Sequence, residues 1–119
     1  MVKAGLHPAT GGDGLSVCSG DMLLEALAAC AGVTLNAVAT AIGFDLRDAS
    51  IIAEGDLDFR GTLSVDKNAP VGFKNIRLKF LLDTAEQAEK INNLIKLTER
   101  YCVVYQTLAR GNDIQVSIA

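Results

Sequence analysis

The chain has 119 residues, the size of one domain, so two separately folded domains are excluded unless copies assemble. Half of the residues are hydrophobic and 21% are charged, which excludes a disordered chain and indicates apolar surface that is buried against a partner. The formal net charge of −3 and the scarcity of aromatic residues exclude a nucleic-acid partner, because no basic face can replace phosphate counterions.

The cysteine usage points to a reducing compartment. Cys18, Cys30 and Cys102 include no CxxC pair, whereas a disulfide-stapled secreted domain would need an even and denser set. The single histidine, His7, gives no zinc signature. The amino terminus, MVKAGLHPATGGDG, lacks the apolar core of a signal peptide. We therefore expect a cytoplasmic protein with reduced thiols and neither metal nor cofactor.

Residues 1–18 are predicted to be loop-like, because Pro8 and the glycine-rich run 10–14 disfavour regular secondary structure. A glycine-rich loop can cradle phosphate, but GGDG has neither the GxxxxGK[ST] spacing nor a preceding strand. A phosphate site is therefore disfavoured here.

The apolar residues 22–42 predict a long helix, with Ser19 as its N-cap and Gly43 as its stop. The stretch is long enough to span a bilayer, but it is rich in alanine, contains charged and polar residues, and has no basic flank. We therefore favour a core helix over a membrane span. At about 100° per residue, polar residues share one narrow ridge and apolar residues fill the opposite side, so we expect burial on most faces. The ridge consists of Asp21, Glu25, Gly32, Asn36 and Thr40.

After the predicted helix, apolar residues recur at every second position. Alternation over residues 48–60 predicts a strand with one apolar face, extending through Leu63 and Val65. Residues 66–70 predict a turn, and alternation over residues 76–82 predicts a second strand that pairs antiparallel with the first.

The last third of the chain predicts two helices and a strand. Residues 84–87 are read as a capping box that opens a helix, with a break at Arg100–Tyr101. A short helix through Cys102 and Leu108 follows and ends at Gly111. Alternating apolar residues at 114, 116 and 118 predict a final strand. This order indicates an α+β fold in which an antiparallel sheet packs against a long helix.

The cysteines are the candidates for chemistry. Cys30 lies mid-helix on the apolar side, where burial without a cationic partner raises a thiol pKa and leaves the group inert. Cys102 falls near the start of a short helix, two residues after Arg100, where unpaired backbone N–H groups favour the thiolate. Cys18, in the loop before the long helix, is interpreted as a tolerated small residue.

Two segments carry a family resemblance. Residues 18–35, CSGDMLLEALAACAGVTL, resemble the helix of the OsmC and organic hydroperoxide resistance family, in which small apolar residues lead to a first cysteine. Residues 99–104, ERYCVV, resemble the segment around the family's second cysteine, which also opens a helix. Residues 59–61 and 72–77 fit the family's strand pair, so the resemblance covers the chain from about Ser16 onward.

The resemblance implies one OsmC-like domain over residues 1–119, with the family's amino-terminal strands largely absent. It implies an α+β fold with an antiparallel sheet packed on a long central helix, in an intertwined homodimer. It also implies a thiol peroxidase in which Cys30 attacks an organic hydroperoxide and Cys102 condenses with the resulting sulfenic acid. A dithiol reductant, lipoyl in some members, then reduces the disulfide. Such a cycle protects the sulfenic acid from further oxidation. Neither nucleic acid nor membrane is expected as a partner.

The chain departs from the family in its charged residues. The family activates its first cysteine with an arginine from a strand before the long helix, whereas here only Lys3 and His7 are basic before Cys30. Asp21 matches the family's acidic residue in some members, although it projects roughly opposite Cys30, and Glu25 is a second supporting candidate.

Arg60 is the arginine we favour as a substitute, because desolvation alone would raise the pKa of Cys30. The alternative is a solvated arginine at the end of a strand. The missing family arginine favours a second functional hypothesis, an OsmC-fold protein without peroxidase activity that binds a small ligand or serves in stress. A third hypothesis is an unrelated α+β interaction domain whose cysteines fill the core.

Overall fold

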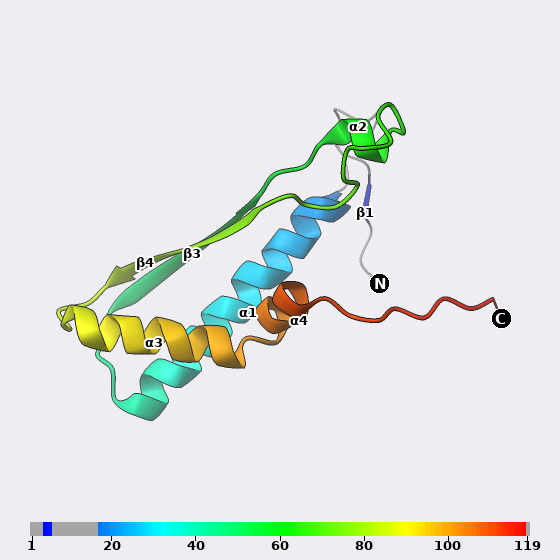
Figure 1. Ribbon diagram of the computed structural model, residues 1–119. Coiled ribbons are helices and arrows are strands. Elements are labelled where there is room, and N and C mark those ends of the chain that lie inside the picture. Colours follow the sequence, from blue (N-terminus) through cyan, green and yellow to red (C-terminus); the bar gives the residue numbers. More distant parts are fainter. Residues whose placement is uncertain (1–3, 6–16, 119) are drawn as a thin grey trace. The chain divides into compact units, whose positions relative to one another are not determined.

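The structure is a computed structural model that describes residues 4–5 and 17–118 (Figure 1). They belong to two compact units, which are described separately. The first unit draws on residues 1–29 and 50–81, and the second on residues 30–49 and 82–119. His7 and the glycine-rich run 10–14 lie outside the described residues.

Two short strands stand within the segment that was predicted to be loop-like. β1 (Ala4–Gly5) and β2 (Val17–Cys18) pair in parallel, with Ala4 opposite Val17 and Gly5 opposite Cys18. A strand of two residues is too short to show any alternation, so the sequence pattern gives no sign of it.

The long helix α1 runs over Ser19–Ile42 and ends where the sequence predicts (Figure 1). Gly43 adopts a left-handed conformation with φ +68°, which glycine adopts without steric cost. The N–H of Gly43 donates to the carbonyl of Thr40 at 3.3 Å, and the N–H of Phe44 donates to that of Ala39 at 2.8 Å. These two bonds form a Schellman motif, which satisfies carbonyls that the helix end would leave open.

The structure buries a narrower stripe of α1 than the sequence predicts. Leu27, Ala31, Leu35 and Ala39 are buried at four-residue spacing, whereas Val33 is exposed. This stripe is the fully buried part of α1. By length and composition α1 could also cross a membrane, a property that core helices of soluble proteins share.

The predicted strand pair is present, but its first strand is shorter than expected. β3 (Asp48–Gly55) and β4 (Ile76–Asp83) form a two-stranded sheet. Asp56 exchanges backbone bonds with Lys74 and Asn75, whereas Arg47 donates to Asp83 at the opposite end, so the strands run antiparallel.

The strand does not extend to Arg60 and Val65, because a one-turn helix, α2 (Phe59–Thr62), begins there. Asp58 caps this helix by accepting a bond from the backbone N–H of Arg60 at 3.1 Å. The helix cap overrides the alternation of apolar residues that favoured a longer strand.

Two helices close the regular structure, α3 (Ala88–Tyr101) and α4 (Val103–Arg110) (Figure 1). The predicted capping box is wrong. The Thr84 hydroxyl donates to the carbonyl of Asp45 at 2.6 Å and accepts from the N–H of Glu86, and α3 begins only at Ala88. A tertiary partner thus takes the hydroxyl that would have capped the helix. The break lies at Cys102, directly after the predicted position, and Gly111 ends α4 as expected.

The predicted final strand is also wrong in the described chain. Residues 111–118 have no regular structure, and Ile114, Val116 and Ile118 are 82%, 90% and 99% exposed. A strand needs a neighbouring edge for its backbone hydrogen bonds, and no described strand of this single chain pairs with the segment.

The second unit has a small, dense core. Leu35, Leu94, Thr98 and Cys102 are its largest fully buried side chains, and the Thr98 hydroxyl donates to the carbonyl of Leu94 at 2.8 Å. The thiol of Cys102 therefore lies in the core of the second unit.

The contact of Gly61 with the loop after α2 gives a test of the fold. A Cβ at Gly61 would overlap the backbone carbonyl oxygen of Pro70, so Gly61→Ala should lower the free energy of unfolding by about 1–3 kcal/mol. Gly72→Ala is the matched control, because its Cβ would meet nothing within 4 Å. Urea unfolding measures both variants, and equal stability of the two would contradict the contact.

Candidate functional site

The candidate site is built on the junction of α3 and α4. The N–H of Cys102 donates to the carbonyl of Thr98 at 3.0 Å, and its own carbonyl accepts from the N–H of Gln106 at 3.0 Å. Cys102 thus ends one helix and begins the next. The first N–H groups of any helix have no carbonyl one turn earlier to bind, so those of Val103, Val104 and Tyr105 are available to other acceptors.

These N–H groups act on the thiol of Cys30. Cys30 is half-buried on α1, and hydrogen bonding by the backbone N–H groups of Val104 and Val103 lowers its pKa. The thiols of Cys30 and Cys102 also interact, which lowers the pKa of Cys30 and raises the pKa of Cys102. We call these two cysteines the thiol pair; both belong to the second unit.

The pKa values of the thiol pair shift in opposite directions. The bond from the N–H of Val104 contributes most to lowering the pKa of Cys30 below its ordinary value, against a smaller opposing effect of burial. Burial is the largest cause that raises the pKa of Cys102, and the neighbouring Cys30 raises it further. Cys30 is therefore the thiol that ionises first.

This assignment reverses the expectation from the sequence. The start of the short helix was expected to favour the thiolate of Cys102, and Cys30 was expected to need a cation. In the structure Cys102 is 1% exposed, and the bonds from Val103 and Val104 lower the pKa of the other thiol. The N–H groups of Tyr105 and Val104 do lower the pKa of Cys102 as well, but burial outweighs them there.

The supporting candidates lie in the first unit. Asp21 and Glu25 are exposed on the first turns of α1. They precede Cys30 by nine and five residues in the sequence. Arg60 is engaged with Asp58, whose carboxylate accepts from the guanidinium Nη2 at 2.6 Å and from Nε at 2.9 Å. This arginine holds the pKa of Asp58 well below its usual range.

Other described arginines also have partners. Arg77 donates to Asp56 at 3.0 Å, and Arg47 lies 3.9 Å from Asp83. The guanidinium of Arg100 lies over the ring of Tyr101, 5.5 Å from its centroid, although it is only two residues from Cys102.

Cys18 lines a cavity of the first unit. The cavity holds about 360 Å³ and is lined mainly by apolar side chains, among them Leu57, Phe59 and Phe73. Phe73 packs closely on a glycine of β3, since a Cβ at Gly55 would come within 2.5 Å of its ring. Cys18 is half-buried at this cavity, and nothing beyond packing is assigned to it.

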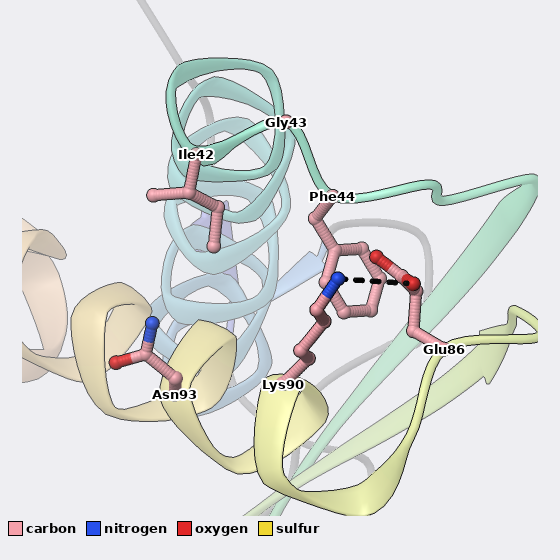
Figure 2. Close-up of a pocket in the computed structure, with 6 residues that line it drawn as sticks. All are labelled: Ile42, Gly43, Phe44, Glu86, Lys90 and Asn93. Carbon is pink, nitrogen blue, oxygen red and sulfur yellow. Dashed lines mark ion pairs between the residues drawn. The ribbon is translucent and has the colours of Figure 1, made fainter.

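A polar cavity of about 160 Å³ lies at the end of α1 in the second unit (Figure 2). The Lys90 ammonium lies 3.6 Å from the carboxylate of Glu86, which also accepts from the N–H of Asp45 at 3.4 Å. The charges of Lys90 and Glu86 thus pair with each other, and no cysteine is among the residues that line the cavity. Among residues 4–5 and 17–118, no group of three His, Cys, Asp or Glu side chains is placed to hold a metal ion.

Comparisons with known proteins agree with the resemblance in the sequence. The family model described as OsmC-like protein matches residues 11–117. Among curated proteins, no relative matches this sequence.

Several solved structures share the fold. An organic hydroperoxide resistance protein OsmC from Legionella pneumophila is 20% identical with a TM-score of 0.71, over 93% of this chain and 74% of that one. An OsmC-like protein from Mycoplasma pneumoniae is also 20% identical with a TM-score of 0.71, over 80% of this chain and 64% of that one. The organic hydroperoxide resistance protein OhrB of Bacillus subtilis is 22% identical with a TM-score of 0.55, over 82% of this chain and 65% of that one.

The opposite pKa shifts give a direct test of the thiol pair. Alkylation by iodoacetamide requires the thiolate, so the rate at Cys30 should reach half its maximum at a lower pH than the rate at Cys102. Peptide mass mapping of samples quenched across pH 5–11 (roughly the range of thiol titration) follows each cysteine separately. In urea-unfolded protein the two midpoints should converge. A lower midpoint at Cys102 in the folded protein would contradict the assignment.

Proposed function

The chain belongs to the OsmC-like protein family, and from this premise we propose that it is a thiol peroxidase that reduces organic hydroperoxides. Cys30 is the attacking thiolate and Cys102 the resolving thiol. The observation that carries the proposal is the pair of interacting thiols, with pKa values shifted in opposite directions, at the start of α4. A thiol with a lowered pKa beside a second thiol is the arrangement that reversible thiol oxidation requires.

The first step oxidises Cys30. Its thiolate attacks the terminal oxygen of the hydroperoxide ROOH, an S–O bond forms and the O–O bond breaks. The sulfur becomes a sulfenic acid, and the leaving alkoxide RO⁻ takes a proton from solvent to give the alcohol ROH. Backbone N–H groups of Val103 and Val104 stabilise the thiolate before the attack.

The second step forms the disulfide. The sulfur of Cys102 attacks the sulfenic sulfur of Cys30, and hydroxide leaves and is protonated to water. While Cys30 is charged it raises the pKa of Cys102, so oxidation of Cys30 removes a charge that opposed ionisation of its partner. Cys102 thus becomes a better nucleophile only after the first step. A dithiol reductant then returns both thiols by exchange and is itself oxidised to a disulfide.

The surroundings of the thiol pair suit an apolar substrate. Val33 lies three residues after Cys30 on α1, Val103 directly follows Cys102, and the two are 73% and 72% exposed. Apolar side chains beside the sulfur favour a hydroperoxide that carries its own hydrocarbon over hydrogen peroxide. The names of the Legionella and Bacillus proteins also refer to organic hydroperoxide resistance.

We further propose an intertwined homodimer in the cytoplasm. The single chain leaves an unusual amount of apolar surface exposed, including Val33, Tyr101 and Val103 near the thiol pair. It also leaves the alternating apolar segment 111–118 without a strand partner among the described residues. Both features are typical of surface that association covers.

Cysteine variants test the peroxidase. Cys30→Ser should abolish turnover of cumene hydroperoxide, and Cys102→Ser should permit one turnover followed by over-oxidation of Cys30, because no thiol is left to trap the sulfenic acid. Stopped-flow kinetics and mass spectrometry measure both effects, and Cys18→Ser serves as the control that keeps turnover. If the wild type reacts no faster than free cysteine, the alternative of an OsmC-fold protein without peroxidase activity gains support.

Sedimentation tests the homodimer. At micromolar concentration and with reductant present, which excludes cross-links through Cys18, the protein should sediment at twice the chain mass of 12.5 kDa. The exposed apolar surface supplies the driving force. A clean monomer under these conditions would overturn the proposed assembly.

A further inference from the structure

The side chain of Gln106 spans the break between α3 and α4. Its amide nitrogen Nε2 donates to the backbone carbonyl of Glu99 at 2.8 Å, which lies seven residues earlier in the chain and in the other helix. The bond is partly buried, and both residues belong to the second unit, which also holds the thiol pair. A side chain of α4 is thus tied to the last turn of α3.

The carbonyl of Glu99 is the one that Val103 would bind if the two helices were continuous, because each carbonyl of an α-helix accepts from the N–H four residues later. The series still holds one position earlier, where the N–H of Cys102 donates to the carbonyl of Thr98 at 3.0 Å. It stops at the next position, because Cys102 has ψ 112°, far from the roughly −42° of an α-helix, and this turns the next N–H away. The amide of Gln106 therefore takes the place of a backbone donor.

Two arrangements of the backbone compete for this carbonyl. In a continuous helix the N–H of Val103 would satisfy it. At a break that N–H is released, and another donor must bind the carbonyl, since a partly buried carbonyl without a partner costs free energy. The released N–H groups at the start of α4 are those that act on Cys30. A side-chain donor at position 106 thus favours the arrangement that the thiol site uses.

We propose that Gln106 is a positioning residue that holds the break between α3 and α4 by occupying the Glu99 carbonyl, so that the N–H groups at the start of α4 stay available to Cys30. The effect of this side chain on the thiol passes through the backbone of α4. The inference rests on the proposed function for its chemical purpose, because the thiolate of Cys30 is the nucleophile of the proposed peroxidase.

The first test removes the amide donor. In Gln106→Met, which has a side chain of similar length, the carbonyl of Glu99 competes for the N–H of Val103. The pH midpoint of Cys30 alkylation by iodoacetamide should therefore rise, and the thiolate fraction at neutral pH should fall roughly 2- to 10-fold. Asn112→Leu is the matched control, because it removes a side-chain amide that donates to a backbone carbonyl at the other end of α4, at 3.2 Å. Its midpoint should equal that of the wild type.

The second test asks whether Gln106 acts through the break. Proline has no N–H and disfavours helical geometry in the residue before it, so Val103→Pro fixes the extended backbone of Cys102 without help from the amide. In this background Gln106→Met should leave the midpoint of Cys30 nearly unchanged. Both proline variants lack the N–H of residue 103, so its direct effect on the thiol cancels in the comparison. Equal shifts in the two backgrounds would show that Gln106 acts by another route and would overturn the inference.

The alkylation assay also separates this inference from the proposed function, because it contains no peroxide. A raised midpoint in Gln106→Met supports the positioning role even if the wild type lacks peroxidase activity. An unchanged midpoint overturns the role, even if the protein is an active peroxidase. Circular dichroism establishes that each variant is folded, and Gln106→Leu takes the place of Gln106→Met if that variant is not.

Discussion

The interruption of the helical run at Cys102 is the constraint on which the site depends. The backbone of Cys102 leaves helical geometry with ψ 112°, so α4 begins anew and presents N–H groups that have no partner within their own helix. A continuous helix from Ala88 to Arg110 would have used those N–H groups for carbonyls one turn earlier. The single extended residue therefore creates the donors that reach Cys30.

Burial makes the two thiols different. Cys102 is packed with Leu35, Leu94 and Thr98 in the core of the second unit, and this desolvation opposes its ionisation. Cys30 is less buried and receives the bonds from the start of α4. The difference in burial thus shifts the pKa values of two chemically identical side chains in opposite directions.

The sequence predicts much of the fold where a local signal coincides with the tertiary structure. Gly43 and Gly111 end helices as expected, and the alternation over residues 76–82 becomes β4. The prediction fails where a distant group changes the local outcome. Thr84 binds the carbonyl of Asp45 in place of a helix end, and the apolar alternation at residues 114–118 has no strand edge among the described residues.

The candidate site shows the same division. The family resemblance paired its two cysteines, and local sequence signals predicted the helix start near Cys102. The helix-start N–H groups lower the pKa of both thiols, as expected for Cys102, but burial outweighs them there, and the sequence does not show how deeply Cys102 is buried.

Arg60 is held by ion pairs within the first unit. Its guanidinium and the ammonium of Lys74 both bind the carboxylate of Asp58, the residue that caps α2. Arg60 is thereby tied to the local structure of the first unit, where it supports the turn after β3. Under the proposed mechanism, backbone N–H groups at the start of α4, in the second unit, activate Cys30. Such donors need no counter-ion and leave the apolar surroundings of the sulfur free of added charge, which is the environment that an organic hydroperoxide favours.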